Sequence, residues 1–223
     1  MLKGVIFDYN GTLYPDDTMH DTAWKRTVIK YFPEIKDVNQ AIKKAPMINN
    51  KIVINYLAEL ARRLPISEEE LKKISYDKEV IYRQLCIENK LDNLMPGAER
   101  LLDYLKNNGF KLNICTSSII TNLEFYIKHN NLAKWFAIEK IVYDNEKVTG
   151  KCEMYKQAIK NLELLPEECL VFEDSKKSIE EAIQAGIKNL IQINHFNKES
   201  YKRKEIIQEI KDFNELDYSI FKK

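Results

Sequence analysis

An aspartate follows a short apolar run near the amino terminus, and a glycine turn follows the aspartate. Residues 4–7 read Gly-Val-Ile-Phe, and Asp8 precedes residues 9–12, which read Tyr-Asn-Gly-Thr. A buried parallel strand has such a run, and open α/β sheets build their sites at the carboxyl ends of such strands. An aspartate in that place can bind a metal ion or attack phosphorus. The alternative is a turn in which Asp8 or Asn10 hydrogen-bonds its own backbone.

Two later segments carry hydroxyl and ammonium groups. Residues 111–115 form a second strand-like run, and Thr116 follows it. Thr116 can donate to a phosphate oxygen, whereas Ser117 or Ser118 can instead cap the next helix. Lys151 stands ahead of a helical apolar pattern. The alternative for Lys151 is a solvated charge, as expected for most lysines in a chain with 35 Lys and Arg residues.

Adjacent carboxylates end a further strand-like run. Residues 169–172 precede Glu173 and Asp174, and a helical pattern follows over residues 179–185 with Gly186 as its predicted C-cap. Adjacent acids also cap helices and favour the positive end of the helix dipole. Carboxylates from two different strand ends are nevertheless the hard oxygen ligands that Mg²⁺ prefers, so we expect Mg²⁺ as a cofactor.

Taken in order, these segments resemble the four motifs of the haloacid dehalogenase-like superfamily, most of whose members are Mg²⁺-dependent phosphatases. The likeness covers nearly the whole chain, because residues 95–97 are similar to the usual approach to the second motif and residues 182–186 to the run after the fourth. Residues 19–24 are similar to the start of the helical cap in the β-phosphoglucomutase and sugar-phosphate phosphatase branch. Trp24 is expected in a hydrophobic core, and the resemblance places His20 near the cap hinge and the active site.

The resemblance implies a role for each site residue. Asp8 attacks phosphorus and forms an aspartyl-phosphate, Lys151 pairs with Asp8 and the phosphoryl oxygens, and Asn10 occupies the acid–base position. The implied metal ligands are Asp8, the Asn10 carbonyl, Asp174 and Glu173, the last directly or through a water. The implied substrate and phosphate contacts are Tyr9, Gly11, Thr12, His20, Thr116, Ser117 and Lys151.

Asn10 departs from the family pattern. The phosphatases carry a second aspartate there, which protonates the leaving oxygen and then activates water. A neutral amide cannot shuttle a proton, and losing general acid–base catalysis typically costs ~10² to 10⁴ in rate. We therefore expect Asn10 to reduce turnover more than binding; the sequence does not distinguish a natural Asn10 from an introduced exchange. Asn10 also precedes a glycine, the dipeptide most open to deamidation, which would restore an aspartate.

The third motif departs from the pattern too. It usually reads Lys-Pro after a longer spacer, whereas Cys152 follows Lys151, so Lys147 is a weaker alternative for the active-site lysine.

The leading functional hypothesis is a phosphoric monoester hydrolase of the phosphatase type that acts on a small phosphomonoester, such as a sugar phosphate. One alternative is another chemistry of the superfamily, either β-phosphoglucomutase-like transfer or dehalogenation. Dehalogenases of this superfamily also lack the second aspartate, yet they need no Mg²⁺. The other alternative is a binding protein that keeps the pocket and has lost catalysis.

The composition excludes other function classes. With 35 basic and 34 acidic residues the formal net charge is +1, which argues against a nucleic-acid or membrane surface driven by charge. No apolar stretch reaches membrane-spanning length and no signal peptide is evident, so we expect a cytoplasmic protein. The four cysteines lack zinc-ligand spacing and are expected to be reduced thiols. The expected partner is a small phosphorylated metabolite, and the oligomeric state is open.

These residues need a scaffold that brings strand ends together. After Gly109 the sequence alternates strand-like and helical segments, which indicates an α/β fold with a Rossmann-like parallel sheet and helices on both faces. The stretch between Pro15 and Asn93 has helical periodicity only. We therefore expect a core of residues 1–15 and 94–223 and an inserted α-helical cap of residues 16–93. The expected strands after Gly109 are 111–115, 137–143, 170–172 and 189–193, and the expected helices are 121–129, 155–162 and 179–185.

Overall fold

The chain forms two compact units in the computed structural model, which describes residues 1–47, 49–145, 150–195 and 200–222. One unit comprises Met1–Pro15 and Asp92–Lys223, and the other comprises Asp16–Leu91. The expected division placed the second boundary between residues 93 and 94, two residues later than in the structure.

The first unit contains a six-stranded parallel sheet with the strand order β3-β2-β1-β4-β5-β6. The strands are β1 (Gly4–Phe7), β2 (Lys111–Ile119), β3 (Val142–Asp144), β4 (Cys169–Glu173), β5 (Asn189–Ile193) and β6 (Ile206–Ile210). All residues of β1 and β4 are buried, as expected for central strands that helices cover on both faces. The predicted Rossmann-like α/β fold is therefore confirmed.

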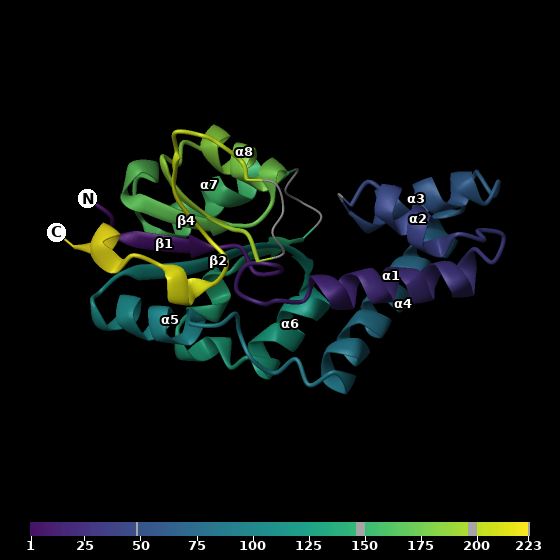
Figure 1. Cartoon of the computed structure of the whole chain (residues 1–223), viewed down its shortest axis with the longest axis horizontal. Helices are drawn as coiled ribbons and strands as arrows, with labels where there is room; N and C mark the ends of the chain where they lie inside the picture. The colour runs from purple at the N-terminus through teal and green to yellow at the C-terminus, as the bar shows by residue number, and fades with distance from the viewer. Residues whose placement is uncertain (48, 146–149, 196–199, 223) are drawn as a thin grey trace. The chain divides into compact units, whose positions relative to one another are not determined.

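Helices cover both faces of this sheet. Figure 1 shows α7 and α8 on one face and α5 and α6 on the other. The helices are α5 (Ala98–Asn107), α6 (Ile120–His129), α7 (Lys151–Leu162) and α8 (Lys176–Gln184), with short 3₁₀ turns at Leu132–Lys134, Ile138–Lys140, Pro166–Glu168, Phe213–Glu215 and Tyr218–Phe221. Apolar side chains of α7 and α8 pack on the sheet in a buried cluster that includes Ile6, Tyr155, Val171 and Ile179.

Several elements differ from the sequence-based expectation; strand β2, for example, extends to Ile119 instead of ending at residue 115. Residues 137–143, expected as one strand, form the 3₁₀ turn Ile138–Lys140 and then the short strand β3, which pairs with β2 only at two positions across a register shift. Helix α7 begins at Lys151, four residues before its first expected apolar position, because an amphipathic pattern does not mark a polar first turn. Strand β6 was not expected, because the adjacent polar residues Gln208 and Glu209 interrupt its apolar run.

The second unit contains four helices: α1 (Asp17–Tyr31), α2 (Val38–Lys44), α3 (Asn50–Leu60) and α4 (Glu68–Glu88). Side chains of Asp37, Asn49 and Ser67 accept backbone N–H bonds at the starts of α2, α3 and α4, so each of these helices is capped. Trp24 is only 4% exposed and lies in the core of this unit, as the sequence predicts. In the part of the chain that the structure describes, none of the helices combines the length and the apolar character needed to cross a membrane.

The cysteines are free thiols, three of them buried. Burial raises the pKa of Cys169 to about 12 and raises that of Cys115 as well. Both thiols therefore stay protonated at neutral pH.

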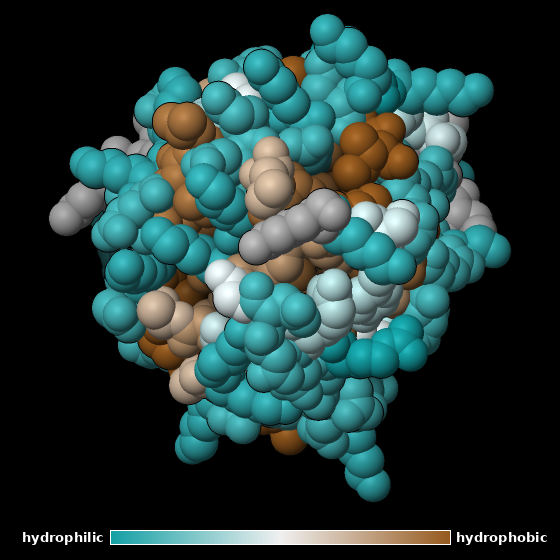
Figure 2. Space-filling model, turned by 90° about the vertical axis from the view of Figure 1, so that its left-hand side faces the viewer, coloured by the Kyte–Doolittle hydropathy of each residue, from teal (hydrophilic) through white to brown (hydrophobic). Residues whose placement is uncertain are grey.

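The face of the molecule in Figure 2 is mostly hydrophilic, with hydrophobic side chains in small separate groups. Exposed large hydrophobic residues of the first unit include Met1, Ile120, Leu165 and Ile207. Single exposed apolar residues of this kind are normal on a folded protein.

The strand order has a topological switch point between β1 and β4. In this order the chain winds outward from β1 to β3 on one side and from β4 to β6 on the other, so the direction of winding reverses between β1 and β4. Ligands of open α/β sheets bind at such a reversal, outside the carboxyl ends of the strands. The residues that directly follow β1 and end β4 are Asp8 and Glu173.

Candidate active site

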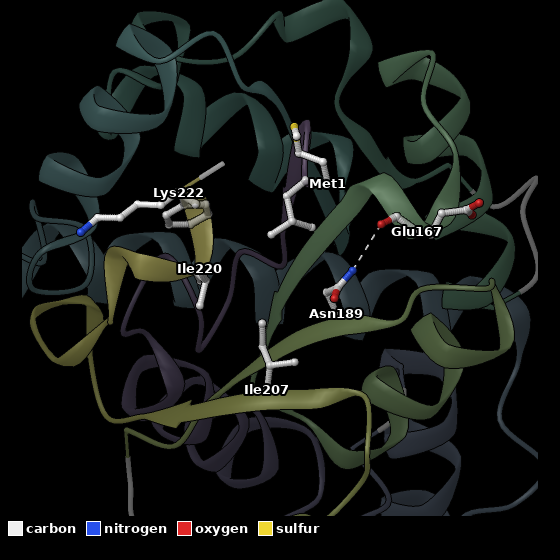
Figure 3. Close-up of a pocket in the computed structure, with 8 residues that line it drawn as sticks. Met1, Glu167, Asn189, Ile207, Ile220 and Lys222 are labelled. Atoms are coloured by element: carbon white, nitrogen blue, oxygen red, sulfur yellow. Dashed lines mark hydrogen bonds between the residues drawn. The ribbon is translucent and has the colours of Figure 1, made fainter.

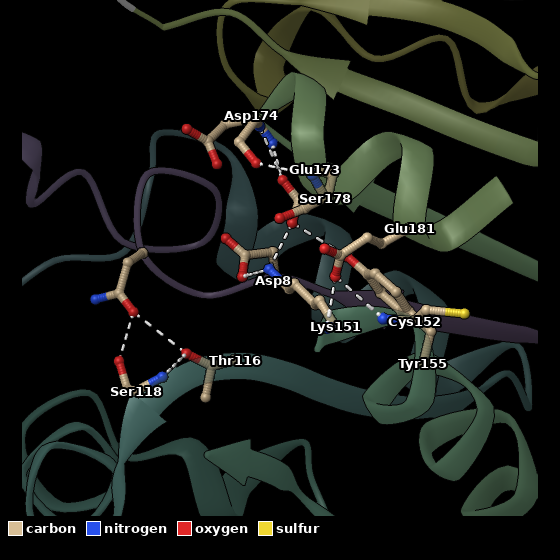
Figure 4. A network of polar contacts seen from close by, with 12 residues as sticks. Asp8, Thr116, Ser118, Lys151, Cys152, Tyr155, Glu173, Asp174, Ser178 and Glu181 are labelled. Atoms are coloured by element: carbon tan, nitrogen blue, oxygen red, sulfur yellow. Dashed lines mark hydrogen bonds and ion pairs between the residues drawn. The ribbon is translucent and has the colours of Figure 1, made fainter. Parts of the chain in front are cut away.

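A buried ion cluster lies at this reversal of the sheet. The ammonium of Lys151 donates to Asp8 Oδ1 and to Glu173 Oε1, each at 2.5 Å. Lys151 is 8% exposed and Glu173 is fully buried. Figure 4 shows the Lys151 side chain pointing between the two carboxylates. Lys151 is therefore not a solvated charge, which was the alternative that the sequence left open.

Glu173 is held by both of its carboxylate oxygens. Oε1 accepts from Lys151 and from the hydroxyl of Tyr155 at 3.1 Å. Oε2 accepts the backbone N–H groups of Asp174 at 2.7 Å and Ser175 at 2.9 Å. Burial works to raise the pKa of Glu173, but the charge of Lys151 and these hydrogen bonds outweigh it, and the pKa is lowered. Glu173 is therefore an ionised partner that fixes Lys151.

The pKa of Asp8 is shifted in the opposite direction from that of Glu173. Burial raises its pKa well above the ordinary value; the Lys151 ammonium opposes this, while the carboxylates of Glu173 and Asp174 add to the rise. For Lys151, burial alone would lower the pKa, but the charges of Asp8 and Glu173 outweigh it and the pKa is raised. The cluster thus contains a permanent cation and a carboxylate whose ionised form needs more positive charge than Lys151 supplies.

Three carboxylates in this place form a set that fits a divalent cation. One oxygen each of Asp8, Glu173 and Asp174 lies within 4.8 Å of the others, and Asp174 is half-buried. Carboxylate oxygens are the ligands that hard cations such as Mg²⁺ prefer, with water and substrate phosphate completing the coordination. The donor set therefore agrees with the expected divalent metal.

Asn10 belongs to a second, uncharged cluster. Its Oδ1 accepts from the hydroxyls of Ser118 at 2.7 Å and Thr116 at 3.2 Å, and its Nδ2 donates to Tyr126 Oη at 2.9 Å. Thr116 Oγ1 also accepts the Ser118 backbone N–H at 3.1 Å. The amide of Asn10 is thus held by three hydroxyl-bearing side chains, and the Thr116 hydroxyl is engaged by Asn10.

The loop that contains Asn10 is a tight turn stabilised by its own backbone. Gly11 has a φ of 74° and its N–H donates to the Tyr14 carbonyl at 2.8 Å. The left-handed φ explains why glycine stands here. Thr12 is fully buried, and the Tyr9 hydroxyl donates to Asn130 Oδ1 at 2.6 Å while its ring stacks on Tyr126. The Tyr9 side chain is therefore part of the packing.

The remaining expected site residues lie as follows. Ser117 is exposed, and Ser118 bonds to Asn10 rather than capping α6, whose N-cap is Ile119 without a side-chain cap. The expectation that either serine caps this helix is therefore wrong. His20 lies on α1 in the second unit, where its ring stacks on Tyr82 at 3.9 Å. Lys147, the weaker alternative to Lys151, lies outside the described residues.

Sequence reasoning missed four residues of these clusters: Ser118 as a partner of Asn10, Tyr126, Tyr155 and Glu181. Tyr126 and Tyr155 occupy buried positions on α6 and α7, and aromatic residues there read as ordinary core. Their hydroxyls gain meaning only once the tertiary fold shows what they reach. Glu181 follows an amphipathic pattern that marks it as a surface residue, yet its carboxylate contacts the start of α7.

A separate pocket of about 350 Å³ lies in the first unit. Figure 3 shows Met1, Glu167, Asn189 and Ile207 around it, with the Asn189 amide donating to the Glu167 carbonyl at 3.4 Å. None of the carboxylates of the ion cluster lines this pocket. It therefore plays no part in the chemistry described here.

The fold and the cluster at its strand reversal define an α/β protein of the Rossmann type with a strand-end aspartate. The model of the haloacid dehalogenase-like hydrolases matches residues 2–186. The chain belongs to this family, as the sequence predicts, and the match includes both clusters.

Individual relatives agree with the family assignment. The chain is 26% identical over 197 residues to a protein of Thermotoga maritima named phosphorylated carbohydrates phosphatase, covering 87% of this chain and 86% of that protein. It is 24% identical over 189 residues to β-phosphoglucomutase of Bacillus subtilis, covering 83% and 81%. A crystal structure of a HAD hydrolase, family IA, variant 3, from Entamoeba histolytica superposes with a TM-score of 0.82 at 30% identity, covering 98% and 96%. These relatives support the expected enzyme class, a phosphatase-type hydrolase.

Proposed function

We propose that this protein hydrolyses small phosphomonoesters, with sugar phosphates as the first class to test, through an aspartyl-phosphate on Asp8 and with Mg²⁺ as its metal. The observation that carries the proposal is the buried contact of Lys151 with Asp8 and Glu173 at the strand reversal, beside Asp174. The phosphorylated carbohydrates phosphatase among the relatives supports the substrate class.

Asp8 is the proposed nucleophile. Lys151 engages Oδ1, so Oδ2 is the oxygen assigned to attack. Oδ2 forms a bond to phosphorus while the bond from phosphorus to the leaving oxygen breaks, which gives the acyl phosphate and the free alcohol. Water then attacks the phosphorus, inorganic phosphate leaves and Asp8 is restored.

Lys151 and Thr116 are assigned to the phosphoryl oxygens. The Lys151 ammonium lies beside the attacking carboxylate and can interact with the charge that builds up on those oxygens. Thr116 donates to Asn10 in the structure, so its hydroxyl must rotate to donate to a phosphoryl oxygen. The backbone amides around Tyr9 and Asn10 are assigned to the remaining oxygens.

The charge balance of the site favours a divalent cation. Three carboxylates face one ammonium, which leaves excess negative charge where a phosphate dianion must bind. Asp8, Asp174 and the Asn10 carbonyl are the proposed ligands. Since Glu173 already accepts four hydrogen bonds, we assign it to orienting its neighbours or a metal-bound water. When bound, Mg²⁺ screens the repulsion between the nucleophile and the substrate.

Proton transfer is the weak step of this site. Asn10 can donate a hydrogen bond to the leaving oxygen but has no proton to give up at neutral pH. The leaving oxygen must therefore take its proton from water. Substrates whose leaving group departs as a stable anion should be favoured.

A phosphatase assay tests the proposal. Release of inorganic phosphate is measured over a panel of phosphomonoesters, including sugar phosphates and para-nitrophenyl phosphate, with Mg²⁺ and with a chelator. Asp8→Asn should abolish Mg²⁺-dependent release, because the amide cannot attack phosphorus, while the unfolding temperature stays close to that of the parent. Near-parental activity of Asp8→Asn would refute Asp8 as the nucleophile.

A binding protein for phosphorylated ligands is the second candidate, and the neutral cluster around Asn10 is the observation that favours it. In that case the panel should show saturable binding by calorimetry without steady turnover. A single burst of product equal to the protein concentration would indicate that the first step occurs and that water attack is blocked.

A further inference from the structure

The amino end of α7 has an acceptor that comes from another helix. Its N-cap residue is Gly150, which has no side chain to accept the first N–H groups. Glu181 of α8 takes this role: its Oε2 accepts the backbone N–H of Lys151 at 2.5 Å and that of Cys152 at 3.2 Å. Figure 4 shows Glu181 with its carboxylate beside Lys151 and Cys152.

This contact concerns the same residue that carries the active-site ammonium. Lys151 is the first residue of α7, so the bond to Glu181 fixes the backbone from which its side chain reaches Asp8 and Glu173. An acceptor is needed here because the first N–H groups of a helix have no partner within the helix. A carboxylate also interacts favourably with the positive end of the helix dipole.

A local feature of the sequence explains why an external acceptor is required. The third motif of the family usually has proline after the lysine, and proline has no N–H to satisfy. In this chain the position is Cys152, whose N–H points to Glu181. Glu181 is also held from its own helix, since its Oε1 lies 3.7 Å from the ammonium of Lys177.

We propose that Glu181 is a positioning residue that fixes Lys151 for phosphoryl transfer. The inference rests on the proposed function, because it acts through Lys151. Without the acceptor, the first turn of α7 loosens and the Lys151 ammonium spends less time between Asp8 and Glu173. A displacement of about 1 Å in such a group can cost up to about 10²-fold in rate.

Two variants of similar length separate this role from simple packing. Glu181→Gln keeps an acceptor oxygen, whereas Glu181→Met keeps length and helix propensity but removes the acceptor. With para-nitrophenyl phosphate and saturating Mg²⁺, we expect Glu181→Met to lower kcat/KM by about tenfold or more. Glu181→Gln should stay within about threefold of the parent, since only its charge is lost.

The same pair of exchanges at Glu168 is the matched control. Glu168 Oε2 accepts the backbone N–H of Leu165 at 2.9 Å and its Oε1 pairs with Lys3. Glu168 directly precedes β4, whereas the site lies at the other end of that strand. Glu168→Met should lower the unfolding temperature without changing kcat/KM by more than about twofold, because it caps a turn that carries no site residue.

A second readout does not depend on turnover. Amide hydrogen exchange of residues 151–154 should be faster in Glu181→Met than in Glu181→Gln. If Glu181→Met does not fold, Glu181→Asn, whose amide is shorter by one methylene, takes its place and should show the same order against Glu181→Gln.

The outcomes separate the inference from the function on which it rests. If Lys151→Ala is inactive while Glu181→Met keeps the parental kcat/KM, the positioning role is refuted and the proposed function stands. If Lys151→Ala keeps the parental activity, the proposed function itself is refuted. Equal losses in Glu181→Met and Glu181→Gln would also overturn the inference, because the acceptor oxygen would then have no effect.

Discussion

Two clusters flank the loop after β1, and they differ in charge. On one side, Asp8, Lys151 and Glu173 are buried and joined by ion pairs. On the other side, the Asn10 amide is held by hydrogen bonds to three neutral groups, the hydroxyls of Thr116, Ser118 and Tyr126. Both clusters use the carboxyl end of the same sheet, and their anchoring residues are separated by a single residue, Tyr9.

The difference separates two chemical tasks. The charged cluster contains what attack on phosphorus needs: a carboxylate, a fixed ammonium and oxygens for a cation. The uncharged cluster offers hydrogen bonds in the place where the family pattern has a proton-transferring carboxylate. In the proposed mechanism the charged cluster supplies the groups for binding and attack, while residue 10 lacks an ionisable group for proton transfer.

Asn10→Asp should place a charge in the uncharged cluster and have the largest effect on turnover. We expect turnover of alkyl phosphates to rise by about 10² or more, because a proton-transferring carboxylate returns to the loop. In this variant, Ser118 and Thr116 would still donate to the side chain of residue 10, and the Tyr126 hydroxyl would rotate to donate to it as well. Such bonds hold the pKa of a carboxylate low, so the new residue should serve better as a base for the water step than as an acid.

A double variant sharpens this prediction. Adding Tyr126→Phe to Asn10→Asp removes one donor, so the gain on substrates with poor leaving groups should increase further. Single-turnover kinetics with an alkyl phosphate and with para-nitrophenyl phosphate separate the two steps. An Asn10→Asp variant no faster than the parent would show that residue 10 does not limit turnover.

Asp174→Ala should weaken the charged cluster alone. Lys151 is held by Asp8 and Glu173, so loss of the Asp174 carboxylate should leave Lys151 in place. The affinity for Mg²⁺ should fall by about tenfold or more, because one of the three carboxylates of the set is lost. Calorimetric titration with Mg²⁺ measures this. Asp144→Ala, at the end of β3, is the control for loss of a strand-end carboxylate, and equal affinities of parent and Asp174→Ala would contradict the assignment.

The pH dependence should report the charge balance at Asp8. Its pKa is raised by burial, so the protonated, unreactive form persists to higher pH than for an exposed aspartate. As pH falls, kcat/KM should therefore decline earlier than an ordinary aspartate would predict. Raising Mg²⁺ from limiting to saturating concentration should move this decline to lower pH, because added positive charge favours the carboxylate. If the pH of this decline does not change with the Mg²⁺ concentration, the decline does not report the protonation of an Asp8 that binds Mg²⁺.

The charged cluster was predictable from the sequence, and the uncharged one was not. Asp8, Lys151 and Glu173 stand next to strand-like runs or ahead of a helical pattern, and strand ends converge in any parallel sheet. Thr116 was expected to face phosphate, and the structure adds that it also contacts Asn10. The roles assigned to these residues stay predictions, although their convergence is observed.

The partners that come from helix faces had no comparable signal. Tyr126 and Glu181 lie on α6 and α8 at positions typical of core and surface, respectively. Which side chain a helix directs toward a loop depends on its packing on the sheet, and a single sequence does not fix that packing. The short strand β3 and the edge strand β6 were missed or misplaced for a related reason, since strand pairing rather than local preference defines them.

Deamidation of Asn10 is the smallest expected effect, and the structure argues against it in the folded protein. The reaction needs the Gly11 nitrogen to attack the Asn10 side-chain carbon, yet the Gly11 N–H donates to the Tyr14 carbonyl and the Asn10 amide is held by Ser118 and Tyr126. We expect the folded protein to keep Asn10 over days at neutral pH, with no gain in activity, while the same chain unfolded in urea deamidates faster. Peptide mass mapping of both samples measures this, and Tyr126→Phe, which removes one acceptor of the Asn10 Nδ2, should fall between them. If the folded parent deamidates as fast as the unfolded chain and gains activity as it does so, the neutral cluster does not protect residue 10. The difference in charge between the two clusters would then decrease as the protein ages, because an aspartate replaces Asn10.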